Sequence, residues 1–254
     1  MTVAYFTKNY RDPSQVAAAA RHYYWLAAHA QPFRQPSLTV VGPTSLTFER
    51  IEGRCAEPGD LPRLAGLLGE AHGAAWVSDL HRTSVDMAHS FRDGTLFGDY
   101  YRPREVALRK RLRFGYLPNK VALHAMLTLL GKTAEGPAAF YKDSNPRNFV
   151  IADDGAVFIV DTDDLTLAPF AYDLAKLIAT LIMTHGPLHD GAADGALATY
   201  NQAAARYDAR LGTTDRERLD GFLVLHSVLT APYIGCHGYR YGWSGLTRQL
   251  QEPS

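Results

Sequence analysis

One short stretch of the chain combines residue types that could carry out phosphoryl transfer. It runs from Tyr141 to Asn148 as Tyr-Lys-Asp-Ser-Asn-Pro-Arg-Asn, and another acid, Asp161, follows 18 positions after Asp143. Phosphoryl transfer needs one carboxylate to take the proton of the acceptor hydroxyl, and an amide and a second carboxylate to hold magnesium. Asp143, Asn148 and Asp161 supply these groups in this order.

A hairpin is expected to position these side chains. Residues 138–140 and 149–151 are apolar and indicate short strands, Asp153-Asp154-Gly155 is a tight-turn signal, and residues 156–160 indicate the return strand. Both ends of the hairpin would then present polar groups at one edge of a small core. An Asp and an Asn five positions apart are weak evidence alone, because both are common loop residues that bond their own backbone. Their combination with Asp161 favours a phosphotransferase site.

Composition limits the class of protein. The chain has 254 residues, 46% of them hydrophobic, which is enough for one large domain or two unequal lobes. The 26 basic and 26 acidic residues cancel, so no net charge favours nucleic acid or membrane as a partner. The two cysteines, Cys55 and Cys236, have no metal-ligand spacing and indicate a reducing compartment. The first residues are too polar for a signal peptide, and no apolar run approaches the ~20 residues of a membrane span. We expect a cytoplasmic protein.

The first part of the chain predicts a reduced αβ lobe over residues 1–54. A strand is expected over 3–8, a helix over 15–30 opened by Asp12-Pro13-Ser14, and strands over 37–41 and 46–50. These elements would form a small antiparallel sheet with one helix, in which the residues Tyr23, Tyr24 and Trp25 pack the helix into the core.

The rest of the chain, residues 55–254, predicts a larger lobe that is mainly helical, with the hairpin at 138–161. Leucines recur at helical spacing from Leu61 to Leu68. Further helices are expected near 79–92, 102–114, 118–131, 172–184, 193–211 and 214–235. The fold class is therefore α+β, with a small αβ lobe before a helical lobe.

A second motif points to a family. Residues 160–175 read Val-Asp-Thr-Asp-Asp-Leu-Thr-Leu-Ala-Pro-Phe-Ala-Tyr-Asp-Leu-Ala. Together with the matches at Asp143, Pro146 and Asn148, they resemble the aminoglycoside phosphotransferase and choline kinase branch of the protein-kinase-like fold. The resemblance is specific over residues 136–185, and elsewhere it rests on the order of the elements. It implies a two-lobe kinase-like fold with a truncated N-terminal lobe, and a reaction that uses ATP and Mg²⁺.

The resemblance implies a role for each acid of the site. Asp143 would be the catalytic base, and Asn148 and Asp161 would be magnesium ligands. Asp163 would be a second metal contact, although it and the acid after it could instead cap a helix. Asp173 would be a structural acid that steadies the catalytic loop.

The resemblance also implies a nucleotide site. Lys8 would pair with the nucleotide phosphates, with a solvated edge-strand lysine as the alternative. The connector that contains Glu49 and Ile51 would be the hinge whose backbone holds adenine. Lys142 could steady the transferred phosphoryl group or face solvent, and Arg147 could contact phosphate or acceptor.

Three departures from the family pattern leave activity less certain than fold. Tyr141 stands where the family has His, and Arg147 stands where it has Gly. Only seven residues precede Lys8, which leaves no room for the usual two strands and glycine-rich loop. The helix after Lys8 has no Glu to pair with it, since the first Glu is Glu49. A catalytically idle kinase-fold protein that binds a peptide or partner protein therefore stays open.

The acceptor is constrained by a basic run. Residues 102–113 contain six basic residues beside one Glu, which indicates either a solvated helix face, with Val106, Leu108 and Leu112 inward, or an acceptor-side patch. Aminoglycosides are polycations that would need an acidic cleft, so a basic run favours a neutral or acidic acceptor.

The motif wording also resembles the stand-alone kinases of lanthidin and thioamitide peptide biosynthesis. That resemblance implies Ser or Thr of a precursor peptide as acceptor and a lyase as partner. A small-molecule kinase of antibiotic resistance is the alternative with the same chemistry. The histidines, His226 among them, have no metal spacing and are expected to be core or surface residues.

Overall fold

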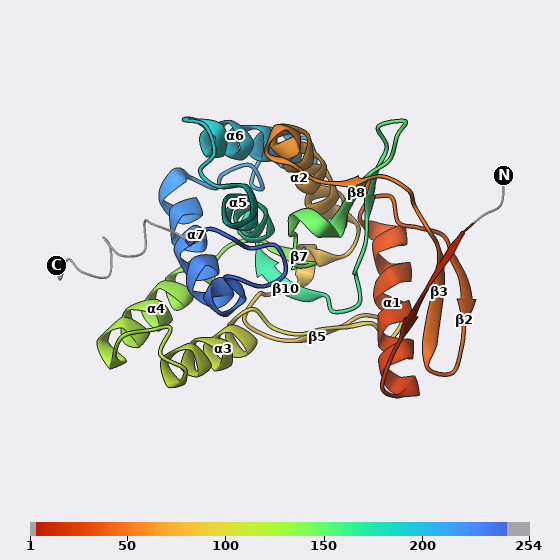
Figure 1. Cartoon of the computed structure of the whole chain (residues 1–254), viewed down its shortest axis with the longest axis horizontal. Helices are drawn as coiled ribbons and strands as arrows, with labels where there is room; N and C mark the ends of the chain where they lie inside the picture. The colour runs from red at the N-terminus through yellow and green to blue at the C-terminus, as the bar shows by residue number, and fades with distance from the viewer. Residues whose placement is uncertain (1–3, 243–254) are drawn as a thin grey trace.

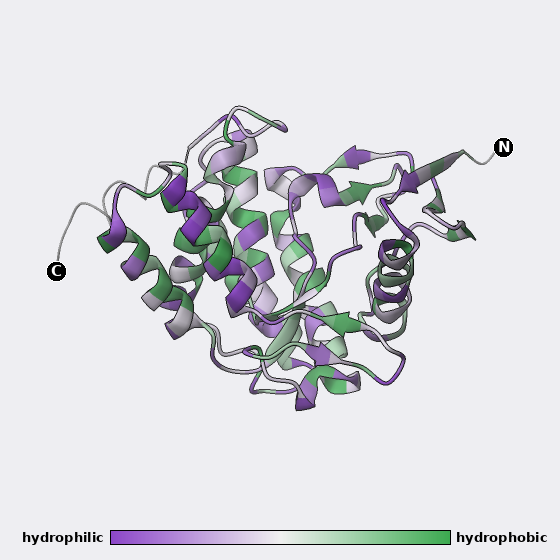
Figure 2. Ribbon diagram, turned by 90° about the horizontal axis from the view of Figure 1, so that it is seen from below, coloured by the Kyte–Doolittle hydropathy of each residue, from purple (hydrophilic) through white to green (hydrophobic). Residues whose placement is uncertain are grey.

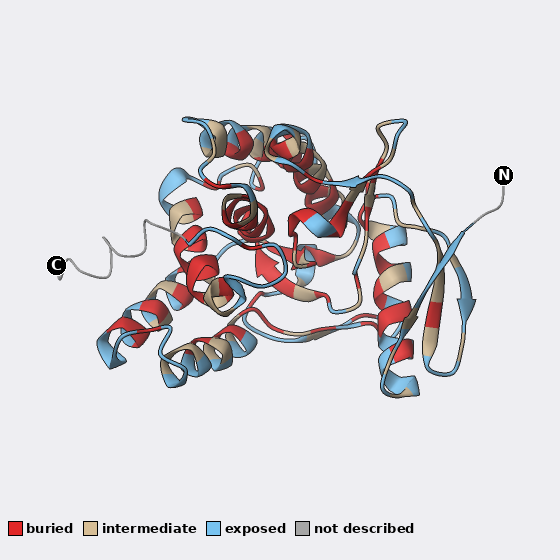
Figure 3. Cartoon of the chain, viewed as in Figure 1, coloured by how far each residue is buried: buried red, intermediate tan, exposed pale blue. Residues whose placement is uncertain are grey.

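The computed structural model describes residues 4–242, which fold into a small αβ lobe and a larger helical lobe (Figure 1). The first lobe holds strands β1 (Tyr5–Asn9), β2 (Leu38–Val41) and β3 (Ser45–Glu49) in the order β1-β3-β2, all antiparallel. These bounds agree with the predicted strands to within a few residues, except that Val3 lies outside the described residues. Leu46 on the central strand is fully buried, whereas Val40 and Val41 on the edge strand β2 are exposed (Figure 3).

Helix α1 (Pro13–His29) joins the two lobes. It begins where predicted, because the Asp12 carboxylate accepts hydrogen bonds from the backbone N–H of Ser14 and Gln15. Its first half packs Val16 and neighbouring alanines against the sheet. Its second half places Trp25, 1% exposed, in the large core, with its ring centroid 4.6 Å from that of Phe97. The expected core role of Trp25 is confirmed, and the core it enters is that of the helical lobe. Tyr23 is only half-buried, and the core role expected for Tyr24 is wrong, because its side chain lies on the outer face of the helix and is 56% exposed.

Among residues 4–242, six α-helices build the second lobe. Polar and apolar residues both occur along the helices, as the hydropathy colours show (Figure 2). Helix α5 is buried on nearly all sides at the centre of the lobe (Figure 3). Helices α2 and α6 pack side by side, as do α5 and α7, and α3 and α4. The bounds are α2 Leu61–Ser78, α3 Tyr101–Arg113, α4 Lys120–Thr133, α5 Tyr172–His185, α6 Ala192–Ala205 and α7 Arg216–Thr230. Four short 3₁₀ turns complete the helical structure of residues 4–242: Pro58–Asp60, Leu80–Arg82, Pro146–Asn148 and Ala231–Tyr233.

The predicted hairpin forms, with one difference in pairing. Strands β8 (Phe149–Ile151) and β9 (Val157–Ile159) pair in antiparallel register, and β4 (Arg54–Cys55) joins β8 on its other side. Strand β7 (Ala138–Tyr141) instead pairs with β10 (Thr166–Pro169), a strand that was not predicted. As a result, the chain enters the site along β7 and leaves it along β10, and these strands hold both ends of the polar segment.

The helix expected near 79–92 is wrong. After the 3₁₀ turn Leu80–Arg82, the chain forms β5 (His89–Ser90), which pairs with β6 (Leu96–Phe97). Thr83 ends the turn because its hydroxyl donates to the carbonyl of Leu80 at 2.8 Å. The hairpin then carries Phe91 and Phe97 into the core against Trp25, which a helix over these residues would not do.

The main core runs through both lobes, from Trp25 in α1 to Val228 in α7. The division of the chain at residue 54 therefore stays a prediction about domains. Within residues 4–242, no helix combines the length and the apolar character that crossing a lipid bilayer requires.

Candidate active site

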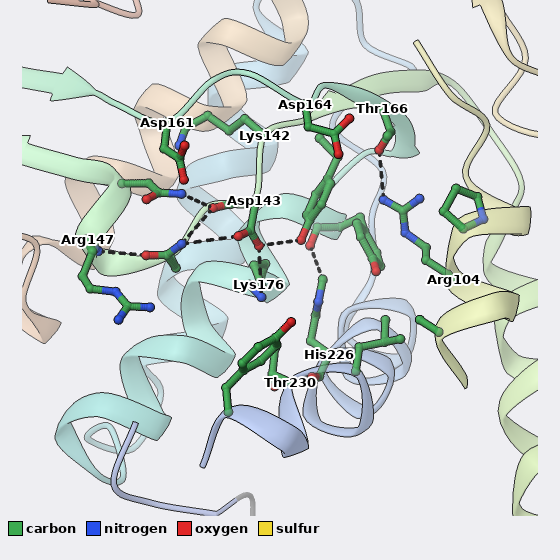
Figure 4. Close-up of a pocket in the computed structure, with 18 of the residues that line it drawn as sticks. Arg104, Lys142, Asp143, Arg147, Asp161, Asp164, Thr166, Lys176, His226 and Thr230 are labelled. Atoms are coloured by element: carbon green, nitrogen blue, oxygen red, sulfur yellow. Dashed lines mark hydrogen bonds and ion pairs between the residues drawn. The ribbon is translucent and has the colours of Figure 1, made fainter. Parts of the chain in front are cut away.

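A polar cleft of about 630 Å³ opens between the β7–β10 segment, α3, α5 and α7 (Figure 4). Asp143, Asn148, Asp161 and Asp163 all line it, so the structure brings together the acids and the amide that were singled out in the sequence. Asp143 and Asp161 both have a left-handed backbone, with φ of 61° and 59°. A left-handed backbone is costly for residues other than glycine and is found most often at functional sites. The cleft is held in this conformation by the elements around it.

Asp173 holds the loop that carries Asp143. It is buried at the start of α5, and its carboxylate accepts hydrogen bonds from the backbone N–H of Ser144 at 2.7 Å and of Lys142 at 3.2 Å. These two amides flank Asp143 in the chain. The structural role expected for Asp173 is thereby confirmed.

The two oxygens of the Asp143 carboxylate have different surroundings. Oδ1 accepts a hydrogen bond from the Tyr141 hydroxyl at 2.8 Å and forms an ion pair with Lys176 at 3.0 Å. Among residues 4–242, Oδ2 receives only a long contact of 3.5 Å from the Asn145 side chain. About half of the Asp143 side chain is exposed to the cleft. One oxygen is therefore anchored, and the other is available to a molecule in the cleft.

The same contacts keep Asp143 ionised. Burial would raise its pKa, but the ammonium of Lys176 and the hydrogen bond from Tyr141 outweigh burial and lower the pKa to about 2. Tyr141 stands where the family has His. Its hydroxyl donates a hydrogen bond to the carboxylate of Asp143.

Asp161 and Asp163 converge on a single cation, the ammonium of Lys8. Lys8 Nζ forms an ion pair with Asp163 Oδ2 at 2.5 Å and another, shorter one with Asp161. Partial burial opposes the charge of Lys8, but these two hydrogen bonds outweigh it and raise the pKa of the amine. Lys8 is therefore not simply a solvated edge lysine, since it pairs with two acids of the site. Its contact with nucleotide phosphates stays a prediction.

Asn148 completes an oxygen-rich set of side chains. Its Nδ2 donates to the backbone carbonyl of Asp143 at 2.9 Å, which leaves Oδ1 as a ligand. Carboxylate and amide oxygens are the ligands that magnesium prefers. Because the carboxylates of Asp161 and Asp163 already converge on one cation, this donor set fits a divalent metal that displaces the Lys8 ammonium. Asp163 and its neighbour do not cap a helix, since the strand β10 follows them.

A second, more apolar pocket of about 570 Å³ adjoins the cleft at Asp161 and Asp163. Glu49 and Ile51, the predicted hinge residues, lie in this pocket together with Lys8, and none of these three lines the polar cleft. The pocket is otherwise lined mainly by the apolar or aromatic side chains of Tyr5, Phe6, Tyr23, Pro36, Phe48, Val150, Ile159 and Val160. Its size and lining suit a flat aromatic group.

Lys142 does not face solvent, so that alternative is wrong. It is 1% exposed, its Nζ lies 4.3 Å from the centroid of the Phe149 ring, and its side chain extends toward Asp161 (Figure 4). The amine has no hydrogen-bond partner among residues 4–242. Burial lowers the pKa of Lys142, partly against the attraction of Asp173 and Asp143. A buried amine without a partner is costly and is expected to meet an anion when the site is filled.

Arg147 lies at the rim of the cleft. Its guanidinium donates to the backbone carbonyl of His237 and lies 5.0 Å from the centroid of the Tyr239 ring. Arg147 thus fastens the segment that follows α7 across one side of the cleft. It is exposed, and a ligand in the cleft could reach it.

Three further residues line the cleft: Lys176, which the sequence did not single out, Arg104, which was considered only as part of the basic run, and His226, which was expected to be a core or surface residue. Lys176 lies three residues after Asp173 on the same helix, and that spacing could have placed it beside the catalytic loop. Arg104 is buried, although the basic run around it was read as a solvated face or a patch. In that run Leu108 is fully buried and Val106 is 53% exposed, so the inward role expected for Val106 is wrong. His226 is buried and donates from Nε2 to the carbonyl of Tyr172, and nothing in the sequence around it signals a place in the cleft.

A small three-stranded sheet with one helix, a larger helical lobe, and a cleft in that lobe that holds Asp143, Asn148 and Asp161 define a protein with the fold of the kinases. Residues 4–222 match the model of the phosphotransferase enzyme family, and the chain belongs to that family. It is therefore a phosphotransferase, and the resemblance seen in the motif over residues 136–185 is confirmed. No curated protein matches the chain by sequence.

Solved structures support the same fold. An amicoumacin kinase in complex with AMP-PNP, Ca²⁺ and amicoumacin has a TM-score of 0.59 at 12% identity, covering 98% of this chain and 79% of its own. Choline kinase LicA from Streptococcus pneumoniae has a TM-score of 0.58 at 12% identity and covers 100% and 81%. A macrolide 2′-phosphotransferase from Brachybacterium faecium has a TM-score of 0.56 at 14% identity and covers 99% and 85%. At such identities the similarity establishes the fold.

Proposed function

We propose that the chain transfers the γ-phosphoryl group of ATP to a hydroxyl group of a peptide or a natural product. One observation carries the proposal: the apolar pocket and the polar cleft meet at Asp161 and Asp163, and Asp143 presents a free oxygen in the cleft. A nucleotide with its base near Glu49 and Ile51 would carry its phosphates to that junction. An acceptor in the cleft would meet them there.

The residues divide the reaction between them. Asn148, Asp161 and Asp163 would hold magnesium, which neutralises the charge that develops on the phosphates. Lys8, which lies beside both acids, would pair with the phosphates. Lys142 is placed to offer its unpartnered ammonium to the transferred group.

Asp143 orients the acceptor. The hydroxyl donates its hydrogen bond to Oδ2 while its oxygen attacks the γ-phosphorus, and the bond from this phosphorus to the bridging β-γ oxygen breaks, so that ADP leaves. The proton passes to Asp143 as the new phosphorus–oxygen bond forms. Tyr141 and Lys176 hold Oδ1 throughout, so the carboxylate does not need to rotate.

A peptide Ser or Thr is our preferred acceptor. The cleft is open and has basic as well as acidic lining residues, Arg104, Arg111 and Arg147 among them, which does not suit a polycationic aminoglycoside. The amino-acid sequence of the motif resembles that of lanthidin and thioamitide kinases, which supports a precursor peptide as acceptor and a lyase as partner.

An idle binding protein is the second candidate, and the Lys8 contacts favour it. The ion pairs of Lys8 with Asp161 and Asp163 occupy the carboxylates that magnesium would need. A protein in which these pairs persist would bind its partner without turnover.

Incubation with Mg-ATP and a panel of Ser/Thr peptides, natural-product alcohols and kanamycin-like sugars tests these candidates, with ADP release and the mass of each acceptor as readouts. We expect a gain of one phosphate on peptides or natural products. Phosphate on the sugars alone would reject the preferred acceptor. If ATP neither binds nor is consumed, even with a partner protein present, the proposal of an enzyme fails.

A further inference from the structure

The cleft contains a buried arginine on the side away from Asp161 (Figure 4). Arg104 on α3 is 6% exposed and lines the cleft, and it forms no ion pair with any carboxylate of residues 4–242 (Figure 4). Three tyrosine rings surround its guanidinium, with centroids at 4.6 Å for Tyr100, 4.7 Å for Tyr172 and 4.9 Å for Tyr141. Buried arginines are ordinarily paired with acids, so the absence of one here needs a reason.

The guanidinium has donors to spare. Nη1 donates to the backbone carbonyl of Tyr100 at 2.8 Å, and Nη2 donates to the Thr166 hydroxyl at 3.3 Å. The side chain of Tyr172 is a third hydrogen-bond partner of Arg104. A guanidinium has five N–H groups in a planar fork, so these contacts still leave N–H groups for a ligand. The tyrosine faces also stabilise the positive charge in part.

The helix that carries Arg104 presents a second arginine to the cleft. Arg104, Ala107 and Arg111 follow one another at helical spacing and all line the cleft. Arg111 donates from Nε and Nη2 to the carbonyl of Leu229, which holds its guanidinium in place. Asp164 also lines the cleft near Thr166, but it does not pair with Arg104. This part of the cleft is therefore dominated by cations.

A single residue connects this arginine with the proposed base. The Tyr141 ring stacks on the Arg104 guanidinium, and its hydroxyl donates to Asp143 Oδ1. A molecule whose hydroxyl group reaches Asp143 Oδ2 would place a second group beside Arg104, on the other side of the Tyr141 side chain.

We propose that the acceptor carries an oxyanion, a carboxylate or a phosphate, in addition to the hydroxyl group that is phosphorylated, and that Arg104 binds this oxyanion with Arg111 beside it. The inference rests on the proposed function, because it assigns the substrate class of the same cleft. A forked guanidinium matches two oxygens of such a group. The acceptor is then a hydroxy acid, a phosphorylated alcohol, or a Ser or Thr beside an acidic residue or a free carboxyl end.

Anion binding can be measured without turnover. The protein is saturated with Mg-AMP-PNP to fill the nucleotide pocket, and inorganic phosphate or acetate is titrated calorimetrically at constant ionic strength. We expect binding to the wild-type protein that is about ten- to hundredfold weaker in Arg104→Gln. The control is Arg113→Gln, which changes an exposed arginine of the same helix that does not line the cleft and should bind the anion as the wild type does.

A second variant avoids removing a buried side chain. Ala107→Glu adds a carboxylate within one helical turn of both Arg104 and Arg111, so it should compete with the anion while the core is unchanged. Circular dichroism checks the fold of every variant. Equal anion affinity of the wild type, Ala107→Glu and any folded Arg104→Gln protein would overturn the inference, as would the absence of anion binding to the wild type.

Transfer to matched acceptors separates the inference from the proposed function. The pairs are N-acetyl-L-serine with N-acetyl-L-serinamide, and Ser peptides flanked by Asp with the same peptides flanked by Asn. We expect the wild type to favour the charged member in kcat/KM, and Arg104→Gln and Ala107→Glu to reduce that preference about tenfold.

The oxyanion site and the proposed function can be rejected independently of each other. Phosphoryl transfer without any preference for the charged acceptors would reject the oxyanion site and leave the proposed function standing. Anion binding that depends on Arg104, with no transfer to any acceptor, would reject the proposed function and leave an anion-binding cleft.

Discussion

The two oxygens of Asp143 give this site its asymmetry at the scale of single residues. Tyr141 and Lys176 hold Oδ1, while Oδ2 faces the cleft with only a long contact from Asn145. A carboxylate anchored in this way loses little freedom when a hydroxyl binds to it. Asp143 can therefore act as the base only if Oδ2 stays free and the carboxylate stays ionised.

Asp143→Asn tests that oxygen directly. The amide has the same shape but cannot accept a proton, so we expect kcat to fall by about 10²–10⁴-fold while the far-ultraviolet circular dichroism is unchanged. Asp153→Asn, in the exposed turn between β8 and β9, is the matched control and should have wild-type turnover. An Asp143→Asn protein as active as the wild type would contradict the assigned base.

Lys176 should set the pH range in which Asp143 works. Because the folded-state pKa of Asp143 is lowered to about 2, its carboxylate in the folded protein stays ionised as pH falls through 5 and 4. The stability that this carboxylate contributes is complete above the pKa of an unfolded Asp, roughly 4, and is lost as pH falls from there through about 2. Lys176→Met removes the ammonium that lowers this pKa, so burial should raise it. We expect an acid limb in the kcat/KM profile of the variant at a higher pH than in the wild type.

The control for this profile is Lys132→Met, which changes an exposed lysine of α4. It should leave the profile unchanged. Identical acid limbs in Lys176→Met and the wild type would mean that Lys176 does not set the charge of Asp143.

At the scale of elements, the first turn of α5 and the catalytic loop act as one unit. The buried Asp173 carboxylate accepts two backbone N–H groups from the residues on either side of Asp143. These hydrogen bonds hold the loop and so keep the backbone of Asp143 in its left-handed conformation. The helix thus positions the loop through its first turn and Asp143 through Lys176 one turn later.

Asp173→Asn should loosen this unit. An amide cannot accept both backbone hydrogen bonds, so we expect the free energy of unfolding to fall by about 1–3 kcal/mol in urea titrations. Activity should fall further than stability alone explains, because the loop loses its anchor. Asp190→Asn, at an exposed position after α5, is the control and should not change either quantity. Wild-type stability of Asp173→Asn would remove Asp173 as the anchor of the loop.

At the scale of the whole molecule, α1 packs against both lobes, and we expect the lobes to unfold as one cooperative unit. Trp25 packs against Phe97 and Phe140 of the larger lobe, while the first half of the same helix covers the small sheet. The position of Lys8 opposite Asp161 and Asp163 follows from that packing, because β1 is held to the helical lobe through α1.

Trp25→Ala should therefore destabilise the whole chain. The loss of a buried indole typically costs about 3–5 kcal/mol, and we expect one cooperative transition at a lower urea midpoint. Tyr24→Ala, next to it and 56% exposed, should cost little. Two separate transitions, with only the first sensitive to Trp25→Ala, would show that the lobes unfold independently.

Much of the site was predictable because its residues are close together in the chain. Asn148 and Asp161 lie at the open end of the β8–β9 hairpin, and hairpin pairing places such residues at one edge without further information. Asp143 lies only five residues before Asn148, in the loop that leads into the hairpin. The other acids of the motif, Asp163, Asp164 and Asp173, lie within the next 12 residues of the chain. The helix predicted near 79–92 failed because local spacing does not reveal which aromatic residues the core will need.

The residue pattern predicted the fold class and the catalytic hairpin, and the resemblance of the motifs to a known family indicated the family and the structural role of Asp173. Only the tertiary structure decided that Lys8 bridges Asp161 and Asp163, that Lys176 and Tyr141 anchor one oxygen of Asp143, and that Arg104 has no carboxylate partner among residues 4–242. The physical reason is that the contacts of Lys8 and Lys176 join segments far apart in the chain, that packing decides where even a near neighbour such as Tyr141 directs its hydroxyl, and that a charge in a run of charges does not show whether packing will leave it in water or bury it. That choice belongs to the elements packed around it.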